Sequence, residues 1–360
     1  MEKKLKILFI SRSIYPEHGG IEIHNYELSR WLSNIAELKL IANTHGNFFL
    51  PVFFPYAIVK AMLLLRYFDV VLLGDGVLGI IGWIVKFFHK KPVICIVHGL
   101  DLTYQMKIYQ KLWVNIFIKI SDKIIAVGNE TIQIGVKKNI PTEKFVFIPN
   151  GVDPEKYFRS YSRSDLEKVI GEKLENRNTI LTLGRLIRRK GVAWFVENVM
   201  PKLSSNLIYI VAGDGPDKNN IERIIKNRNL QKSVKVLGYV NDQTKGILFN
   251  TCDLFIQPNI KVKGDMEGFG IAVIEAASCH LPVIASKLEG LQDAIKDNQN
   301  GFLIEPYDVK GYIRKINELF ENAEFRKGSG KKAREFVIEN YSWSIIAQKY
   351  LEEIKKTIRK

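Results

Sequence analysis

The sequence contains few cysteines and no cysteine spacing typical of a metal site. Its three cysteines, Cys95, Cys252 and Cys279, lie far apart in apolar stretches. This odd number argues against a disulfide-stabilised scaffold, because such scaffolds pair many cysteines within a short chain. We therefore predict free, buried thiols in a reducing compartment.

A secretory signal and a membrane-spanning run are also missing. The first residues, MEKKLKILFISRS, turn apolar only briefly and have no small-residue cleavage site. The most apolar segment, 48–65, is interrupted by Pro51, Pro55 and Lys60, which argues against a spanning helix. The sequence has no internal repeat of the kind that would indicate a solenoid. We expect a globular, cytoplasmic protein.

Basic residues are in excess, but they are not concentrated. Lysine and arginine number 53 against 38 acidic residues, a net charge of +15, of which residues 1–150 carry +7. The even spread disfavours a nucleic-acid-binding protein and favours an anionic small molecule or a membrane surface as partner. With 46% hydrophobic residues over 360 positions, the chain is long enough for two domains with their own cores.

Short apolar runs alternate with amphipathic stretches in both halves of the chain. Continuous apolar strands between helices indicate parallel sheets covered on both faces. Twelve strands are predicted, at 5–11, 38–43, 69–74, 92–97, 123–128, 145–149, 179–184, 207–212, 234–238, 253–257, 282–286 and 301–305. The polar segment 154–178 separates two groups of six. We predict an α/β protein with Rossmann-like domains at 1–160 and 175–340, and a C-terminal helix at 341–360 that packs back toward the first domain.

Two loops of the first domain carry residues suited to a ligand at the carboxyl ends of strands. Gly19 and Gly20 open a helix whose N–H groups favour a phosphate, although a plain turn is the alternative. This loop is not Gly-x-Gly-x-x-Gly, and Gly-x-x-x-x-Gly-Lys-Ser/Thr does not occur, so a nicotinamide cofactor or ATP lacks its fingerprint. After the fourth strand, His98 is placed to face a ligand and Asp101 to orient it; a hydrogen bond to a loop carbonyl is the alternative.

The second domain has a basic cluster between its first strand and the following helix. In the segment 184–191 (GRLIRRKG), Arg185 and Lys190 can neutralise a diphosphate. We expect Arg188 and Arg189 to be solvated instead.

The most specific pattern is a pair of glutamates in the segment 264–277. Glu267 lies in a glycine loop and Glu275 about one and a half turns into the next helix, so both can line one pocket. The amides at 269–271 suit a phosphate. Carboxylates beside a phosphate are favourable only if they bind hydroxyls, which indicates a sugar and a ribose as ligands.

In this order the motifs resemble those of the retaining glycosyltransferases of family 4, which have the GT-B fold, with two Rossmann-like domains facing a central cleft. The resemblance covers nearly the whole chain and is strongest across 179–306. The matching motifs are Gly-Gly-x-Glu at 19–22, His98-Gly99-Leu100-Asp101, Asn150-Gly151-Val152-Asp153, Gly184-Arg185 with Lys190-Gly191, Gly213-Asp214-Gly215 and the glutamate pair. Lys287-Leu288-Glu289-Gly290 departs from the family's usual Gly-Gly, which leaves donor contacts at 290–292 open.

The resemblance implies roles for these residues. Glu267 would bind the donor sugar's hydroxyls, and Arg185 and Lys190 would stabilise the leaving diphosphate, with His98 as the fourth catalytic residue. The implied donor-binding residues are Gly19, Gly20, Gly184, Gly213, Gly215, Gly268, Phe269, Gly270, Ile271 and Glu275. The resemblance also implies that Glu22, Asp101 and Asn150 support the donor-binding residues or lie on the acceptor side. No cofactor or metal is implied, because two cations take the metal's place and no Asp-x-Asp ends a strand.

The implied reaction moves a hexosyl unit, with retention, from a UDP- or GDP-linked donor to a glycan or lipid-linked acceptor in cell-surface polysaccharide or glycolipid synthesis. Fixed cations aimed at the leaving group would be the main source of catalysis. The alternatives are a GT-B sugar-nucleotide epimerase or phosphorylase-like enzyme, and a non-catalytic glycan-binding protein.

The first domain is unusually apolar where an acceptor site is expected. Residues 48–65 are rich in phenylalanine, and 77–91 and 107–120 mix aromatic residues with lysines. An apolar face rimmed by lysine is typical of a helix at a membrane interface. For 77–91 a core helix is the favoured interpretation. We predict peripheral contact with the anionic inner face of the cell membrane, and no nucleic-acid partner.

Overall fold

The computed structural model describes residues 4–15 and 19–359, which form two compact units. Unit 1 contains the N-terminal part up to Gly151 together with the C-terminal segment from Trp343, and unit 2 spans Val152–Ser342. The chain thus changes unit at 151–152, before the boundary at 160 that the sequence suggests. Residues 152–160 belong to unit 2.

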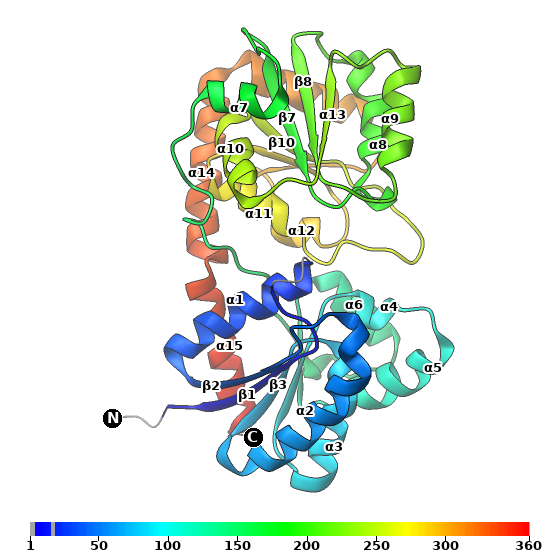
Figure 1. Ribbon diagram of the computed structural model, residues 1–360, viewed down its shortest axis with the longest axis vertical. Helices are drawn as coiled ribbons and strands as arrows, with labels where there is room; N and C mark the ends of the chain where they lie inside the picture. Colours follow the sequence, from blue (N-terminus) through cyan, green and yellow to red (C-terminus); the bar gives the residue numbers. More distant parts are fainter. Residues whose placement is uncertain (1–3, 16–18, 360) are drawn as a thin grey trace. The chain divides into compact units, whose positions relative to one another are not determined.

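Unit 1 is built on a six-stranded sheet in which every strand pair is parallel (Figure 1). The strand order is β2-β1-β3-β4-β5-β6. The strands are β1 (Lys6–Ser11), β2 (Glu37–Ala42), β3 (Val70–Leu73), β4 (Val93–Val97), β5 (Lys123–Ala126) and β6 (Phe145–Phe147). All six lie where the sequence predicts them, because buried parallel strands are apolar along their whole length.

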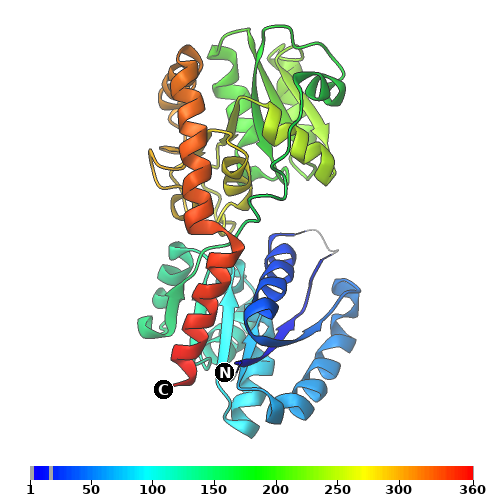
Figure 2. The same cartoon turned by 90° about the vertical axis from the view of Figure 1, so that its left-hand side faces the viewer.

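Helices cover both faces of this sheet, because alternate strand residues point to opposite sides. Leu8 and Ile10 share a core with α2 (Leu50–Leu64), α3 (Gly79–His89) and the π-helix η4 (Gln110–Ile118). Ile7 and Phe9 share the other core with α1 (Gly20–Ile35) and α15 (Trp343–Ile358). Figure 2 shows α15, in red, lying along the sheet of unit 1. The remaining short elements are η1 (Asn47–Phe49), η2 (Leu65–Tyr67), η3 (Gly76–Leu78), α4 (Leu100–Thr103), α5 (Lys107–Tyr109), α6 (Asn129–Lys137) and η5 (Thr142–Lys144).

Unit 2 has a second parallel sheet of six strands, in the order β12-β11-β10-β7-β8-β9. The strands are β7 (Asn178–Leu183), β8 (Leu207–Ala212), β9 (Val234–Gly238), β10 (Leu254–Gln257), β11 (Val283–Ser286) and β12 (Phe302–Ile304). Numbered within the unit, this is the doubly wound order 3-2-1-4-5-6. All six strands again match the prediction, so the α/β fold of two Rossmann-like units is confirmed.

The helices of unit 2 are also divided between the two faces. One face is covered by α8 (Val192–Asn198), α9 (Lys218–Asn227) and α13 (Val309–Glu321). On the other face, Phe255 of β10 packs on Phe249 of α10 (Asp242–Thr251). The remaining elements are α7 (Arg163–Ile170), η6 (Arg188–Lys190), η7 (Met200–Lys202), α11 (Ile271–Ser278), α12 (Leu291–Ala294) and α14 (Ala323–Tyr341). Side-chain caps fix several helix starts: Asn241 accepts from the Thr244 N–H, and Asp308 from the Gly311 N–H.

The cysteines and the apolar segment 48–65 can now be placed. The three cysteines are free and buried, as predicted. The helical segment Leu50–Tyr67 is long and apolar enough to cross a membrane by length and composition. Phe53, Ala57 and Ala61 of this segment nevertheless lie in the core of unit 1.

Candidate active site

The candidate site of unit 2 lies at the carboxyl ends of its central strands. The strand order reverses between β7 and β10, and such switch points are where open parallel sheets bind ligands. The loops after β7, β8 and β10 contain the segments 184–191, 213–217 and 258–270. These segments carry most of the second-domain residues that the sequence singles out.

The centre of this site is the buried carboxylate of Glu267. Its Oε2 accepts from Lys190 Nζ at 2.6 Å and from Arg189 Nη1 at 2.6 Å. The side-chain amides of Gln257 and Asn259, at the end of β10, donate to the same oxygen at 3.3 and 3.1 Å. Four donors from two loops therefore converge on one oxygen.

Electrostatics keep Glu267 ionised despite its burial. Burial alone raises the pKa of this carboxyl, but the charges of Lys190 and Arg189 outweigh it and lower the pKa to about 2. The pKa of Lys190 is lowered, mainly by burial, while Glu267 opposes the shift. An ionised glutamate of this kind accepts hydrogen bonds and donates none, so it suits a ligand with hydroxyl groups.

Arg189 corrects one expectation. It is not a solvated cation: its Nε donates to Asp265 Oδ1 at 2.9 Å while Nη1 holds Glu267. The reason is the tight turn η6, which points Arg189 into the site. Its neighbour Arg188 is exposed, as expected. In sequence, the adjacent cations of 184–191 carry no signal that separates these two orientations.

Arg185 differs from Lys190 in that its side chain is open to an incoming ligand. It is exposed, and no partner for its guanidinium is found among the described residues. Lys190 is 12% exposed and already paired with Glu267. An incoming anion can therefore meet Arg185 directly, whereas it must compete with Glu267 for Lys190.

Gly213 and Gly215 allow two of these loops to approach closely. Gly213 has a φ of 138°, and a Cβ there would lie 1.9 Å from the Gly184 carbonyl oxygen. A Cβ on Gly215 would lie 2.3 Å from the oxygen of Leu186. Only glycine fits at both positions, so these turns bring the loop after β8 against the loop that carries Arg185 and Lys190.

The start of α11 carries the other predicted donor residues. Gly268 leads into this helix, Gly270 is its N-cap and Ile271 its first residue. The Phe269 side chain is buried against Tyr341, with ring centroids 5.7 Å apart, so only its backbone is available to a ligand. The free N–H groups at this helix start suit an anion.

Glu275 occupies a different electrostatic environment from Glu267. It is half-buried, and burial raises its pKa while Lys245 and Lys156 oppose the shift. The pKa is therefore lowered for Glu267 and raised for Glu275, although the sequence presents the two glutamates as a pair. Glu275 is suited to a hydroxyl at a less charged part of a ligand.

Glu289 stands where the family pattern has glycine. The structure shows why glycine would suit this position and what the glutamate does there. Its φ is 49°, a conformation that favours glycine. Its Oε2 accepts from the Glu267 backbone N–H at 2.7 Å. The loop at 287–291 thus holds the Glu267 loop through a side chain.

Unit 1 has its own polar cluster at the carboxyl ends of β1, β3 and β4. His98 Nε2 lies 3.1 Å from the Gly74 carbonyl oxygen, and Asp101 Oδ2 accepts from the His98 backbone N–H at 2.7 Å. Asp101 therefore braces the His98 loop rather than the imidazole, which corrects the expectation that it orients the ring. Arg12 Nε lies 2.9 Å from Asp75 Oδ2.

Burial governs the ionisation of this cluster. It lowers the pKa of His98, although the Gly74 carbonyl opposes this, and it raises the pKa of Asp101. The pKa of Asp75 rises to about 6, because burial outweighs the charge of Arg12. His98 is therefore neutral at pH 7 and donates through Nε2, which leaves Nδ1 as an acceptor.

His24 belongs to the same cluster and was not predicted. It is fully buried on α1, and its ring centroid lies 5.0 Å from that of His98 and 5.4 Å from that of Trp343. Burial lowers the pKa of His24 well below its ordinary value, and a hydrogen bond with the Asn150 side chain opposes this shift only in part. A lone histidine on an amphipathic helix gives no sequence signal of this kind. Asn150 is therefore placed behind the histidine pair.

The glycine loop before α1 is only partly described, because residues 16–18 lie outside the described ranges. Gly19 is the N-cap of α1 and Gly20 its first residue. The Glu22 carboxylate folds over Gly19: a Cβ on Gly19 would lie 2.1 Å from its Oε2. The Glu22 carboxylate thus lies beside this helix start and leaves no room for a side chain at Gly19.

Unit 1 also contains a Gly-x-Gly-x-x-Gly segment, 74–79, which was not among the predicted sites. It follows β3 and opens the next helix, but its glycines serve packing. A Cβ on Gly76 would lie 2.8 Å from Asp101 Cβ, and one on Gly79 would lie 3.1 Å from the Phe117 backbone. Asp75 caps the turn by accepting from the Val77 N–H. The segment is therefore no dinucleotide site.

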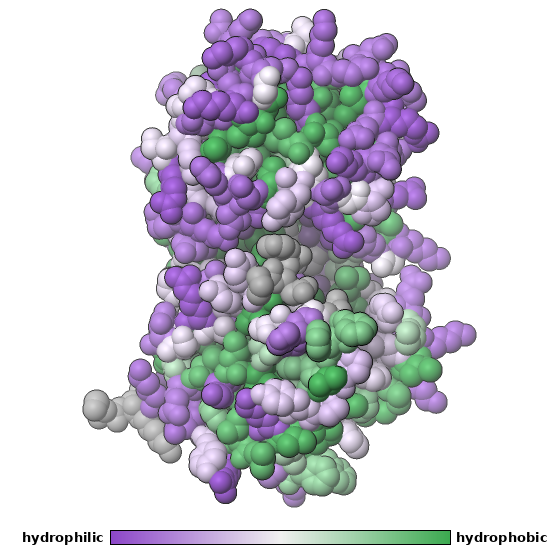
Figure 3. Space-filling view, viewed as in Figure 1, coloured by the Kyte–Doolittle hydropathy of each residue, from purple (hydrophilic) through white to green (hydrophobic). Residues whose placement is uncertain are grey.

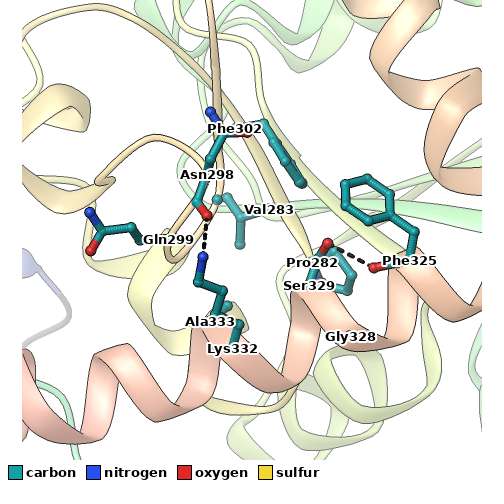
Figure 4. A pocket seen from close by; sticks show the side chains of 11 residues that line it. Pro282, Val283, Asn298, Gln299, Phe302, Phe325, Gly328, Ser329, Lys332 and Ala333 are labelled. Carbon is teal, nitrogen blue, oxygen red and sulfur yellow. Dashed lines mark hydrogen bonds between the residues drawn. The ribbon is translucent and has the colours of Figure 1, made fainter.

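Neither a metal cluster nor a small cavity elsewhere in unit 2 competes with these sites. Across residues 4–15 and 19–359 no group of three or more potential metal ligands occurs. A cavity of about 240 Å³ in unit 2 lies at the amino-terminal ends of β11 and β12, away from the carboxyl ends that carry the site. Figure 4 shows Lys332 of α14 donating to the Asn298 carbonyl at its rim, with Val283 and Phe302 behind.

The comparisons with known proteins agree with this geometry. Residues 164–336 match the family Glycosyl transferases group 1, and residues 18–156 match Glycosyltransferase Family 4. The chain belongs to the group 1 glycosyl transferases. It is 31% identical over 261 residues to the Escherichia coli UDP-Gal:alpha-D-GlcNAc-diphosphoundecaprenol alpha-1,3-galactosyltransferase, a match that spans 69% of this chain and 65% of that protein.

Other relatives of this glycosyltransferase match it over nearly its full length. An uncharacterized glycosyltransferase of Methanocaldococcus jannaschii is 25% identical over 98% of both chains. Anabaena HepE, crystallised in complex with UDP, superposes with a TM-score of 0.81 at 20% identity and covers 98% of this chain and 100% of its own. The GT-B fold of the glycosyltransferase is thereby confirmed.

Within each unit, the structure of the glycosyltransferase brings predicted residues together. Lys190 and Glu267 meet directly in unit 2, with Gly213 and Gly215 shaping the neighbouring loops. His98 and Asp101 meet in unit 1. The side chains that the sequence did not identify are Arg189, Gln257, Asn259, Glu289 and His24.

Proposed function

We propose that this glycosyltransferase moves a hexosyl unit from a UDP- or GDP-linked donor to a lipid-linked glycan, with retention and without a metal. Unit 2 would bind the donor and unit 1 the acceptor, in cytoplasmic synthesis of a cell-surface glycan. The observation that carries the proposal is the ionised Glu267 at the meeting point of Lys190, Arg189 and two amides.

The donor fits the charges of unit 2. Arg185 offers a guanidinium without a partner among the described residues, and Lys190 a second cation, for a diphosphate. As the sugar–phosphate bond breaks, negative charge grows on the leaving group, and fixed cations stabilise that charge. They supply what a bound metal supplies elsewhere. Activity in EDTA equal to that without it is the expected result, and loss of activity would contradict metal independence.

Retention is the stereochemical outcome that the resemblance to the family 4 enzymes implies. Glu267 Oε2 accepts from four donors, which fixes this ionised carboxylate in place. We infer that Glu267 accepts from sugar hydroxyls. NMR of the first-formed product is expected to show the donor's anomeric configuration; inversion would contradict this.

A lipid-linked acceptor is supported by the Escherichia coli relative, whose name gives a diphosphoundecaprenol-linked acceptor and a UDP-linked donor. Because a ligand that binds the folded state raises its melting temperature, a thermal-shift screen of UDP- and GDP-sugars identifies the donor. Transfer from that donor to GlcNAc-diphosphoundecaprenol is then the direct assay. Release of nucleotide and free sugar without transfer to any acceptor would favour the epimerase-like alternative, and no shift with any nucleotide sugar would favour the glycan-binding one.

A further inference from the structure

The helix α2 of unit 1 is apolar on two opposite faces. One stripe, formed by Phe53, Ala57 and Ala61 and continued by Leu65 of η2, is buried in the core. A second stripe is exposed to solvent and consists of Val52 (69% exposed), Tyr56 (48%), Val59 (59%) and Leu63 (68%). Its spacing of three or four residues places these side chains along one line of the helix. Core packing accounts for the first stripe but not for the second.

The exposed apolar surface continues onto the neighbouring helices. Phe87 and Phe88, at the end of α3, are 68% and 64% exposed. Ile108 and Ile116, from α5 and η4, are 65% and 43% exposed. Figure 3 shows hydrophobic side chains gathered on unit 1 over α2 and α3, whereas the same view of unit 2 is mostly hydrophilic. We call this surface of α2, α3, α5 and η4 the apolar face.

The charges on the segments that form the apolar face are mostly positive. Residues 44–121 contain eight lysines and arginines, namely Lys60, Arg66, Lys86, Lys90, Lys91, Lys107, Lys111 and Lys119. The same residues contain three acids: Asp75 and Asp101 are buried, and Asp69 is half-buried and accepts from the Lys6 N–H. The apolar face is therefore bordered mainly by cations, of which Lys86 is paired with Asp122, its Nζ lying 2.7 Å from Oδ1.

We propose that the apolar face docks on a lipid bilayer that contains anionic lipid. This deepens, and rests on, the proposed transfer to a lipid-linked acceptor, because that acceptor lies in a membrane. Apolar side chains at the centre and cations at the rim match the acyl boundary and the phosphate layer of such a surface. A second copy of the chain fits poorly, since two such rims would repel each other. The helix lies on the surface and does not span it, because Phe53, Ala57 and Ala61 hold it to the core.

Vesicle flotation with the full chain tests the proposal. The wild type is expected to float with vesicles of phosphatidylcholine and phosphatidylglycerol, and to bind pure phosphatidylcholine less. The double variant Val59→Glu/Leu63→Glu is expected to bind at least about tenfold less, because it puts two charges where apolar area should be buried. Tyr239→Glu, at an exposed apolar position of unit 2 (66% exposed), is the matched control and should float like the wild type.

Two further measurements keep the result interpretable. Lys107→Glu/Lys111→Glu should reduce the phosphatidylglycerol-dependent part of binding, and an unchanged melting temperature shows that each variant is folded. Wild-type protein that stays with the unbound fraction would overturn the proposal, as would undiminished binding of Val59→Glu/Leu63→Glu. So would a self-association in ultracentrifugation that the same variant abolishes, with no vesicle binding. If the protein floats but no nucleotide sugar raises its melting temperature, the docking stands and the proposed function fails.

Discussion

The two units share one architecture but present opposite chemistry. Both place polar groups at the carboxyl ends of a six-stranded parallel sheet. In unit 2 the cations Arg189 and Lys190 bind one ionised carboxylate, and Arg185 of the same loop is exposed. In unit 1 the acids Asp75 and Asp101 are buried and have raised pKa values. Unit 2 is thus suited to an anion that carries hydroxyls, whereas unit 1 is not.

The outer surfaces differ in the same way. Exposed large apolar side chains are concentrated in unit 1, while those of unit 2, such as Tyr239 and Tyr307, are scattered. Scattered exposed apolar residues need no explanation, but a contiguous face indicates a partner. The difference shows that one fold can be specialised twice within a chain, by its strand-end loops and by its helix surfaces.

The largest effect should come from removing the unit 2 cations. Lys190→Ala and Arg185→Ala should each lower turnover by roughly 100-fold or more, because charge on the leaving diphosphate would lose a fixed partner. Steady-state kinetics with the donor found by thermal shift measures this. Arg188→Ala is the matched control, since Arg188 is exposed in the same loop. If all three variants behave alike, the assignment of an anion site to unit 2 is wrong.

A smaller effect is expected for Arg189, which contacts Glu267 and, in the proposed function, would act on the ligand through that carboxylate. Arg189→Gln removes one of the two charges that lower the pKa of Glu267, so that pKa should rise. The acid side of the profile of kcat/KM against pH should then move to higher pH, while Arg188→Gln leaves it in place. An unmoved profile would limit Arg189 to a packing role.

Stability at low pH provides a third test, confined to unit 2. The folded-state pKa of Glu267 is about 2, below its ordinary value of 4.5, so ionised Glu267 stabilises the fold above pH 4.5. This contribution, about 3 kcal/mol at most, is lost as the pH falls from 4.5 toward 2. Urea unfolding should therefore show that Glu267→Gln is less stable than the wild type at pH 6, and that the gap narrows by pH 3. A constant gap would show that Glu267 does not titrate as described.

The smallest effect concerns His98 in unit 1. Because burial lowers its pKa, NMR titration of its ring should give a pKa below the ordinary value of 6.5. A pKa above 6.5 for His98 would mean that the acids of unit 1 are ionised and control the cluster, and that the contrast with unit 2 is weaker than described.

The fold was more predictable than the site. Buried parallel strands are continuous apolar runs, so all twelve could be located from sequence, and the order of motifs identified Glu267 and Lys190. The direction of individual side chains could not be predicted. Arg188 and Arg189 are identical neighbours, yet the turn η6 exposes one and buries the other against Glu267. His24 likewise joins His98 only through tertiary packing.

The central claim is that Glu267 serves sugar transfer from a nucleotide sugar bound in unit 2. The most direct test compares wild type, Glu267→Gln and Glu324→Gln in transfer from the donor identified by thermal shift to GlcNAc-diphosphoundecaprenol. Glu324 is 90% exposed on α14 and serves as the matched glutamate. We predict transfer by the wild type and by Glu324→Gln at similar rates, and a loss of roughly 100-fold or more in Glu267→Gln. Equal rates for all three proteins would contradict the claim.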